Sequence, residues 1–595
     1  TNKIMIKGGE FLIKDQEAKD IFIPEEFGED QKMMASATKE FVEKELDPHR
    51  ERFEKKDYKL TEDCMKKAGE LGLLGISVPA EYGGMGMSFN TSVLICDKIS
   101  GSNGSFSTAF GAHTGIGTLP ILLYGDDAQR SKYLPKLASG EWMGCYCLTE
   151  PGAGSDANSG KTKAVLTDDG KHYLITGQKM WISNAGFADI FIVFARIEDD
   201  QNITGFILEK GMEEITLGKE EQKLGLNSSS TRQVFFNDVK VPVENLLGGR
   251  GNGFKIAMNA LNVGRIKLSA AILDACRRVI GLSTNYSNER IQFGIPIANF
   301  GAIKHKLADM AVRTYAIEST TYRSGADIEK NILRLEAEGV DHQEAHLKGI
   351  EEYAIECSIV KVLGSETIQF CSDEGIQIYG GMGYSADAPM EAAYRDARIA
   401  RIYEGTNEIN RMLLVGIILK KAMKGELDIM GPAMKVAESL MSIPSFDKLD
   451  NSVLFEVEKE QIKKLKKAIL MCAGKAAQHF AMTIEREQEV LMNLADMIIE
   501  VYTAESAILR AEKLTAKNGE DVTEHQIDMS KLYLYQAIKN CNQSGEEVIL
   551  SFAEGDEQRM LLMGLKRFTK GYTINPKEMR RNIANKLIEE NRYCF

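Results

Sequence analysis

Eight residues, Arg401-Ile402-Tyr403-Glu404-Gly405-Thr406-Asn407-Glu408, carry the most information about this chain. They place a carboxylate between an aromatic side chain and a Gly-Thr-Asn turn. Gly405 frees the backbone beside Glu404, so a ligand can approach the main chain closely. This arrangement suits a general base whose own amide N–H can also donate a hydrogen bond. A helix end is the more ordinary explanation of a Glu before a Gly, so the spacing alone leaves both interpretations open.

Four further segments occur upstream of this one: Tyr146–Asp156, Trp181–Asn184, Arg290–Gly294 and Gln377–Gly383. In this order they resemble the motifs of the acyl-CoA dehydrogenases, over most of the first 420 or so residues. The long C-terminal remainder makes the chain most similar to the very-long-chain members of that family, which also carry an extension.

Composition limits the function classes. The chain has 595 residues, 44% of them hydrophobic, only 12 prolines, and a net charge of −13. These values are typical of an ordered, mostly helical, multidomain protein, and the negative charge argues against general nucleic-acid binding. An anionic coenzyme A thioester would therefore need a local cluster of Lys and Arg.

The ten cysteines are scattered. Cys145 and Cys147 form a C-x-C pair with no second pair to complete a zinc site, so packing beside a ligand is the expected role. Free thiols fit a reducing compartment, which predicts the cytoplasm of a bacterium or the mitochondrial matrix of a eukaryote. No run of 18 apolar residues is evident, Met412–Leu419 being the densest stretch, and residues 1–20 lack the apolar core of a signal peptide.

Hydrophobic periodicity predicts a mainly α chain with a central β domain. Amphipathic helical spacing runs through Gln31–Leu46 and Glu62–Leu73, whereas Thr167–Gly170 predicts a hairpin turn in a β-rich stretch. Glycines at Gly248–Gly253 end that stretch, and Gly431-Pro432 marks a linker. Gly519-Glu520-Asp521 predicts a break within the helical extension. The expected domains are a helical domain at 1–145, a β-barrel-like middle domain at 146–250, a four-helix bundle at 251–422, a linker at 423–452 and a helical extension at 453–595.

The resemblance implies a chemistry. Removing an α proton and a β hydride from an acyl thioester requires a base, a hydride acceptor and a dry site. In the family the acceptor is FAD, and Glu404 matches the residue that removes the α proton while the flavin N5 takes the hydride. Some relatives carry the base just before the arginine that corresponds to Arg265; here that residue is Gly264, which cannot act as a base.

The resemblance also assigns the ligand contacts. FAD contacts are expected at Tyr146, Leu148, Thr149, Gly154, Ser155, Trp181, Ser183, Arg290, Gln292, Phe293, Gln377, Gly381, Thr406 and Glu408. Among these, Phe293, Gln377 and Gly381 would contact the FAD of a neighbouring subunit, which implies at least a homodimer. Substrate contacts are expected at Ser155, Asn262, Arg265 and Gly405.

Each assignment has an ordinary alternative. The Thr149–Asp156 stretch also fits a surface β-turn, Trp181 a core tryptophan and Arg265 a solvated helix arginine. His342 and His346 lie one helical turn apart but lack a metalloprotease spacing, so no metal site is expected.

Substrate length and the extension are open at this level. The helix near Ser107–Pro120 should line the acyl pocket, and its small residues Thr108, Gly111, Ala112, Gly115 and Gly117 permit a long acyl chain or, equally, close helix packing. Lysines 463, 464, 466 and 467 permit peripheral membrane contact, although a helical cap on the dimer is favoured.

Three functions remain in view. The leading one is a long-chain acyl-CoA dehydrogenase of fatty-acid β-oxidation that passes electrons to an electron-transferring flavoprotein. The others are an acyl-CoA oxidase that uses oxygen and a non-catalytic assembly or scaffold protein.

Overall fold

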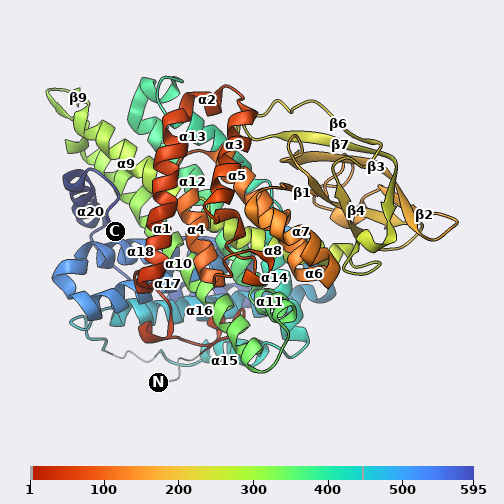
Figure 1. Ribbon diagram of the computed structural model, residues 1–595. Coiled ribbons are helices and arrows are strands. Elements are labelled where there is room, and N and C mark those ends of the chain that lie inside the picture. Colours follow the sequence, from red (N-terminus) through yellow and green to blue (C-terminus); the bar gives the residue numbers. More distant parts are fainter. Residues whose placement is uncertain (1–4, 445–447) are drawn as a thin grey trace.

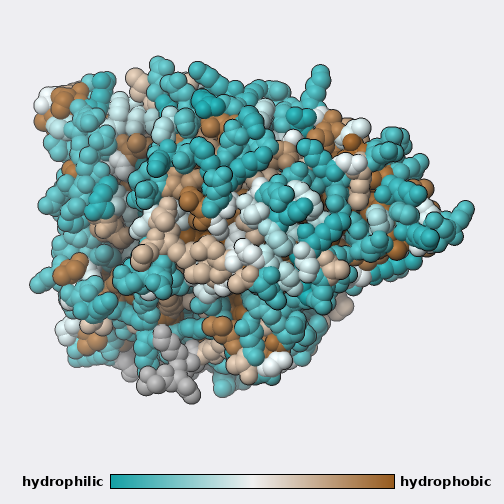
Figure 2. All heavy atoms as spheres, in the orientation of Figure 1, coloured by the Kyte–Doolittle hydropathy of each residue, from teal (hydrophilic) through white to brown (hydrophobic). Residues whose placement is uncertain are grey.

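A computed structural model describes residues 5–444 and 448–595. Helices form most of the body, and a β domain projects from one side of it (Figure 1). The prediction of a mainly α protein with a central β domain and a helical C-terminal extension is therefore confirmed. On the face shown in Figure 2, hydrophobic residues form small groups among hydrophilic ones.

The N-terminal helices carry buried apolar faces, as the periodicity predicted. Their first long helix is shorter than expected, because α1 ends at Phe41 and the next turn, Val42–Leu46, is π-helical. A second π-helical turn, Ala112–Ile116, follows α5, and such turns are frequent at functional sites. The helices are α1 (Glu29–Phe41), α2 (Arg50–Glu54), α3 (Tyr58–Glu70), α4 (Phe89–Ile99), α5 (Gly104–Gly111), α6 (Leu119–Tyr124) and α7 (Asp127–Ser139).

The middle domain is an eight-stranded sheet with the order β6-β7-β3-β2-β4-β5-β8, in which β1 pairs in parallel with β4. The predicted hairpin is present, since β2 and β3 are antiparallel around Thr167–Gly170. Cys145 and Cys147 lie on one face of β1 with their Sγ atoms 3.9 Å apart, but they pack in this domain's core and do not line the cavity described below. The strands are β1 (Gly144–Cys147), β2 (Lys163–Leu166), β3 (His172–Ser183), β4 (Ile190–Ile197), β5 (Thr204–Glu209), β6 (Ile215–Leu217), β7 (Thr231–Pro242) and β8 (Leu246–Leu247).

The second helical part packs around α12, which is buried along most of its length. Gly253–Glu289, which spans two helices, is apolar enough to cross a membrane by length and composition, a stretch that the sequence analysis did not single out. Its most apolar window is 72% buried, as expected for core helices. The helices are α8 (Gly253–Ala270), α9 (Leu273–Glu289), α10 (Gly301–Ala337), α11 (His342–Glu351), α12 (Ala354–Tyr379), α13 (Met390–Ala397) and α14 (Asn407–Met423); the short strands β9 (Ile291–Gln292) and β10 (Ile295–Pro296) form a hairpin after α9.

The C-terminal extension is helical and contacts the bundle through α17, α18 and α20. The expected linker contains an unpredicted helix, α15, because a proline in the first turn of a helix costs no intrahelical hydrogen bond. Gly519, with φ 89°, separates α17 from α18 at the predicted break. The helices are α15 (Met430–Ser439), α16 (Glu456–Phe480), α17 (Gln488–Asn518), α18 (Glu520–Phe552), α19 (Gly555–Thr569) and α20 (Pro576–Glu590).

Buried ion pairs join the extension to the start of the chain. Arg510 on α17 bonds both Glu25 and Glu318, at 2.5 and 2.6 Å between nitrogen and oxygen. Lys466 on α16 bonds Asp15 at 2.9 Å and Glu505 at 2.5 Å. Lys466 is therefore not available to a membrane surface.

Candidate active site

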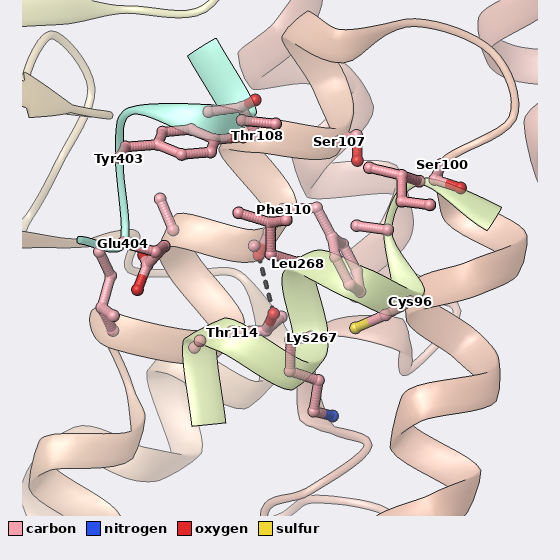
Figure 3. Close-up of a pocket in the computed structure, with 18 of the residues that line it drawn as sticks. Cys96, Ser100, Ser107, Thr108, Phe110, Thr114, Lys267, Leu268, Tyr403 and Glu404 are labelled. Atoms are coloured by element: carbon pink, nitrogen blue, oxygen red, sulfur yellow. Dashed lines mark hydrogen bonds between the residues drawn. The ribbon is translucent and has the colours of Figure 1, made fainter. Parts of the chain in front are cut away.

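A cavity of about 810 Å³ lies where the N-terminal helices, the middle domain and the bundle meet. Its walls come from α4, α5, α8, β1, β3 and the segment before α14. Figure 3 shows Tyr403 and Glu404 on one side of it and Cys96 and Ser100 on the other. The volume is in the range of small-molecule sites.

The backbone at Glu404 is held in an unusual conformation. Glu404 has φ 61° and Gly405 has φ 77°, so two successive residues are left-handed just before α14 begins. A left-handed non-glycine residue costs about 1–3 kcal/mol and persists only where its surroundings enforce it. Here the Arg265 Nε donates to the Glu404 carbonyl at 3.2 Å, and Asn410 Nδ2 donates to the carbonyls of residues 404, 405 and 406. These hydrogen bonds hold the backbone in its strained conformation and so fix the direction in which the Glu404 side chain leaves it.

The Glu404 carboxyl group is buried and one of its oxygens, Oε2, has no hydrogen-bond partner. Burial raises the pKa of Glu404 to about 7, and the nearby positive charges of Arg265 and Lys361 oppose that rise only in part. A carboxyl group in a cavity wall with a pKa near neutrality is suited to accept a proton.

Gly264 lies directly beneath that carboxylate. A Cβ atom at residue 264 would be 2.5 Å from the Glu404 Oε2, closer than any van der Waals contact allows. The glycine that cannot serve as a base thus also makes room for the residue that can.

We expect Gly264→Ala to lower kcat at least tenfold, because a shift of about 1 Å in a reacting group can cost up to 10²-fold. Alanine is also a better helix former, so the protein should remain folded. Stopped-flow flavin reduction measures the rate, with Gly416→Ala as the control, since a Cβ at Gly416 meets nothing within 4 Å. An unchanged rate in Gly264→Ala would contradict the assigned role of Glu404.

Two aromatic residues of the predicted site lie in the cavity wall. The Tyr146 hydroxyl is buried without a hydrogen-bond partner, and burial together with the Glu404 charge raises its pKa well above the usual value. Trp181 lines the cavity and is 53% exposed, so it is not a core tryptophan. The pairing of β3 with β7 shifts between Lys179 and Ile182, and this bulge re-aims Trp181.

The Thr149–Asp156 segment forms a turn beside the cavity. Glu150 and Ala153 exchange backbone hydrogen bonds at 3.0 and 3.1 Å, so the ordinary β-turn interpretation holds for the local geometry. Glu150 is buried against Lys179, at 2.6 Å between oxygen and nitrogen, which anchors the turn. Thr149, Gly154 and Ser155 line the cavity, so the turn also presents hydroxyl and backbone groups to a ligand.

The structure separates the predicted site residues into three sets. Those that line the cavity are Tyr146, Leu148, Thr149, Gly154, Ser155, Trp181, Ser183, Arg265, Glu404 and Gly405. Those that support or flank the Glu404 segment are Asn262, which accepts from Arg265 at 3.4 Å, Thr406, which caps α14, and the exposed Glu408. Those that lie outside the cavity on exposed surface are Arg290, Gln292, Phe293, Gln377 and Gly381.

Lys361 and Asn410 were missed by the sequence analysis. The Lys361 Nζ donates to the Gly405 carbonyl at 2.8 Å and to Asn407 at 2.6 Å, and burial lowers its pKa to about 7. A single lysine in the apolar run Ile359–Leu363 was the available signal, because an unpaired lysine is seldom placed among buried aliphatic residues.

A second polar cluster lies elsewhere. Glu336, His342 and His346 bring possible metal-ligand atoms within 4.8 Å of one another, although the sequence analysis expected no metal site. The Glu336 carboxylate already bonds the His342 Nδ1 at 2.9 Å, and the His346 Nδ1 bonds the His342 carbonyl at 3.0 Å. These hydrogen bonds explain why the three side chains lie together at the ends of α10 and α11.

Comparison with known proteins agrees with this arrangement. Family models described as acyl-CoA dehydrogenase N-terminal, middle and C-terminal domains match residues 28–141, 145–239 and 251–419, and a further C-terminal domain model matches residues 464–567. These matches cover most of the chain in the order of the structural parts. The chain belongs to the acyl-CoA dehydrogenase family, and the predicted resemblance is confirmed.

Individual relatives match most or nearly all of the chain. A probable acyl-CoA dehydrogenase of Bacillus subtilis is 43% identical over 99% of this chain and 98% of its own. The mitochondrial very long-chain specific acyl-CoA dehydrogenase of Rattus norvegicus is 33% identical over 87% of this chain and 79% of its own. A crystal structure of an acyl-CoA dehydrogenase complexed with FAD from Bacillus anthracis has a TM-score of 0.95 and 42% identity, over 99% of this chain and 100% of that one.

Proposed function

We propose that this enzyme oxidises long-chain acyl-CoA to trans-2-enoyl-CoA with FAD, in fatty-acid β-oxidation, and that Glu404 removes the α proton. The observation that carries the proposal is the Glu404 carboxyl group in the cavity wall, which is buried, has an oxygen without a hydrogen-bond partner and extends from a strained, hydrogen-bonded backbone. An electron-transferring flavoprotein is the proposed electron acceptor. The thiols of the described cysteines are all unpaired, which supports a reducing compartment, the bacterial cytoplasm or the mitochondrial matrix.

The cavity fits a flavin. The Trp181 indole offers an aromatic face, and the hydroxyls of Thr149, Ser155 and Ser183 line the same wall. The unpartnered Tyr146 hydroxyl is a buried polar group that a bound ligand would satisfy. When bound, FAD supplies the hydride acceptor that no side chain can provide.

The protein's own residues control the proton. Glu404 takes the proton, Gly264 leaves space for its carboxyl group, and Arg265 and Asn410 hold the backbone behind it. The apolar wall excludes water, so a bound acyl chain would raise the pKa of the carboxyl group further.

The test is anaerobic titration of the purified holoenzyme with palmitoyl-CoA, followed by flavin absorbance. Bleaching that is slow to reverse in air is expected. Rapid reoxidation by oxygen would identify an oxidase instead, and a flavin spectrum unmoved by palmitoyl, octanoyl or branched thioesters would favour a scaffold.

Preference for long chains rests on the wall formed by α5 and the π-helical turn after it. A Cβ atom at Gly111 or Gly115 would meet nothing within 4 Å, so both residues border open space in the cavity. Gly117 differs, because its Cβ would be 2.9 Å from the Gly144 carbonyl carbon and its role is close packing. The small residues thus serve both purposes: Gly111 and Gly115 leave room for an acyl chain, and Gly117 allows close packing.

Gly111→Leu should shorten the cavity. We expect kcat/KM for palmitoyl-CoA to fall at least tenfold while that for octanoyl-CoA changes less than threefold. The leucine side chain would clash with the longer acyl chain, at an overpacking cost of about 1–3 kcal/mol, whereas the shorter chain would not reach it. Gly111→Ala is the matched control. Equal losses for both substrates would show that residue 111 does not bound the acyl chain.

The exposed residues outside the cavity support a homodimer. Phe293 is 95% exposed at the tip of the β9–β10 hairpin, with φ 53°, and Gln377 and Gly381 are also exposed. An exposed aromatic at a rigid tip is typical of an interface residue.

Phe293→Asp should weaken the dimer and lower FAD retention together, because the proposed contact joins one subunit to its partner's FAD. Light scattering and the ratio of flavin to protein measure the two effects. Leu71→Asp, at a residue that is 59% exposed after α3, is the control. A variant that stays dimeric and keeps its flavin would contradict this interface.

A further inference from the structure

A lysine lies in the wall of the acyl cavity. Lys267, on α8, lines the cavity and follows Arg265 by two residues in the sequence. Figure 3 shows its side chain extending away from Glu404, on the side of Cys96. Its surroundings are otherwise apolar, including Leu268 and the Phe89 ring, whose centroid is 5.5 Å from the Lys267 Nζ.

No carboxylate neutralises this ammonium group among the described residues. The Lys267 Nζ bonds the Ser92 hydroxyl, and the one titratable neighbour that acts on it is the Cys96 thiol, which stays neutral because burial raises its pKa. Burial lowers the pKa of Lys267, as expected for an ammonium removed from water. The other carboxylates along the cavity are engaged elsewhere: Asp47 with Arg278, Glu54 with Arg395, and Asp396 with the amides of residues 104 and 226.

Packing alone does not explain the residue. An ammonium with a single neutral partner in an apolar wall is unfavourable, and a methionine would fill the same space without that cost. The Lys267 ammonium has two donor positions left after the Ser92 contact, because the group carries three N–H donors. A ligand oxygen in the cavity is the remaining acceptor of suitable chemistry.

We propose that the cavity accepts acyl-CoA thioesters whose far end carries a carboxylate, and that the Lys267 ammonium, held in place by its bond to Ser92, binds that terminal carboxylate. The inference rests on the proposed acyl-CoA dehydrogenase function and specifies its substrate class. Glu404 reacts at the thioester end, whereas Lys267 recognises the opposite end of the same chain. Because an ω-carboxyl substrate must reach both Glu404 and Lys267, the distance between these two residues selects its chain length. A methyl-ended substrate has no such second contact, so its chain length should be selected less sharply.

The test compares two matched series, straight-chain acyl-CoA and ω-carboxyacyl-CoA thioesters of 8 to 16 carbons, on the wild type and on Lys267→Met. In the wild type, kcat/KM for the ω-carboxyl series should peak at one chain length. At that length, the ratio of ω-carboxyl to methyl-ended kcat/KM should fall at least tenfold in Lys267→Met. Lys255→Met, at an exposed lysine of the same helix, should leave the ratio unchanged.

A binding measurement separates this inference from the proposed reaction. Calorimetric titration of Glu404→Gln with the same thioesters gives affinities without turnover, and adding Lys267→Met should weaken only the ω-carboxyl ligands. A ratio that Lys267→Met leaves unchanged, with methyl-ended substrates still oxidised, would overturn the substrate class alone. Failure of every thioester to reduce the flavin would overturn the proposed function, whatever the affinities.

Discussion

Replacing Glu404 with glutamine is expected to lower kcat by about 10²–10⁴-fold, the usual contribution of a general base. Glutamine keeps the size of the side chain, and the backbone contacts of Arg265 and Asn410 to residue 404 involve its carbonyl, so the fold and the ligand sites should persist. Single-turnover flavin reduction by palmitoyl-CoA measures the loss. The flavin spectrum and thioester affinity should match those of the wild type.

The same carboxyl group predicts a pH dependence. Because burial raises the pKa of Glu404 to about 7, the proton-accepting form becomes dominant only above neutrality, and kcat/KM of the wild type should rise with pH through that region. The same pKa shift has the opposite effect on stability, which falls as pH rises. A carboxyl whose pKa is higher in the folded state than in the unfolded state stabilises the fold at low pH, and this stabilisation is lost as pH rises from about 4.5 to about 7.

Glu404→Gln should therefore unfold at a higher temperature than the wild type at pH 8 and show a smaller difference at pH 5. Glu426→Gln, at an exposed residue, is the control for loss of one carboxylate. A Glu404→Gln enzyme that retains more than a tenth of wild-type kcat would remove Glu404 from the role of base.

Arg510→Met is expected to destabilise the protein by about 3–5 kcal/mol, the usual cost of removing one partner from a buried ion pair. The Arg510 guanidinium is 2% exposed and bonds Glu25, Glu318 and the Ser319 hydroxyl. Removing it leaves the Glu318 carboxylate, which is also buried, with Arg277 as its remaining cationic partner. Denaturant titration followed by circular dichroism measures the loss.

Lys513→Met is the matched control on the same helix. Lys513 pairs with Glu26, and both side chains are partly exposed, so its removal should cost less than about 1 kcal/mol. Similar losses for the two variants would mean that burial does not distinguish these pairs.

Sequence reasoning succeeded where information is local. The hairpin at Thr167–Gly170, the break at Gly519 and the Glu404 segment are each encoded by residues close together in the chain. Helix ends were less accurate, because nothing in the sequence distinguishes the π-helical turn after Phe41 from a continuing α-helix. The helix α15 was missed because proline was taken as a linker signal.

Contacts distant in sequence could not be predicted. Glu25 and Arg510 are 485 residues apart, and neither neighbourhood marks the other as its partner. The positions of Lys361 and Lys267 are of the same kind, since only the packing of helices turns a lysine in an apolar run into a group beside the reacting carboxylate or along the cavity. The assignment of roles within the cavity therefore needed the three-dimensional arrangement.

The ion pairs that join α17 to Glu25 and to α10 also set an order of events during synthesis. Glu25, Glu318 and Arg323 leave the ribosome well before Arg510 and Glu505, the residues that neutralise them from α17. Until translation reaches that helix, the nascent bundle carries charges that burial cannot accommodate, and the surface of α10 that meets α17 stays hydrated. Completion of this part of the core therefore waits until α17 has been synthesised.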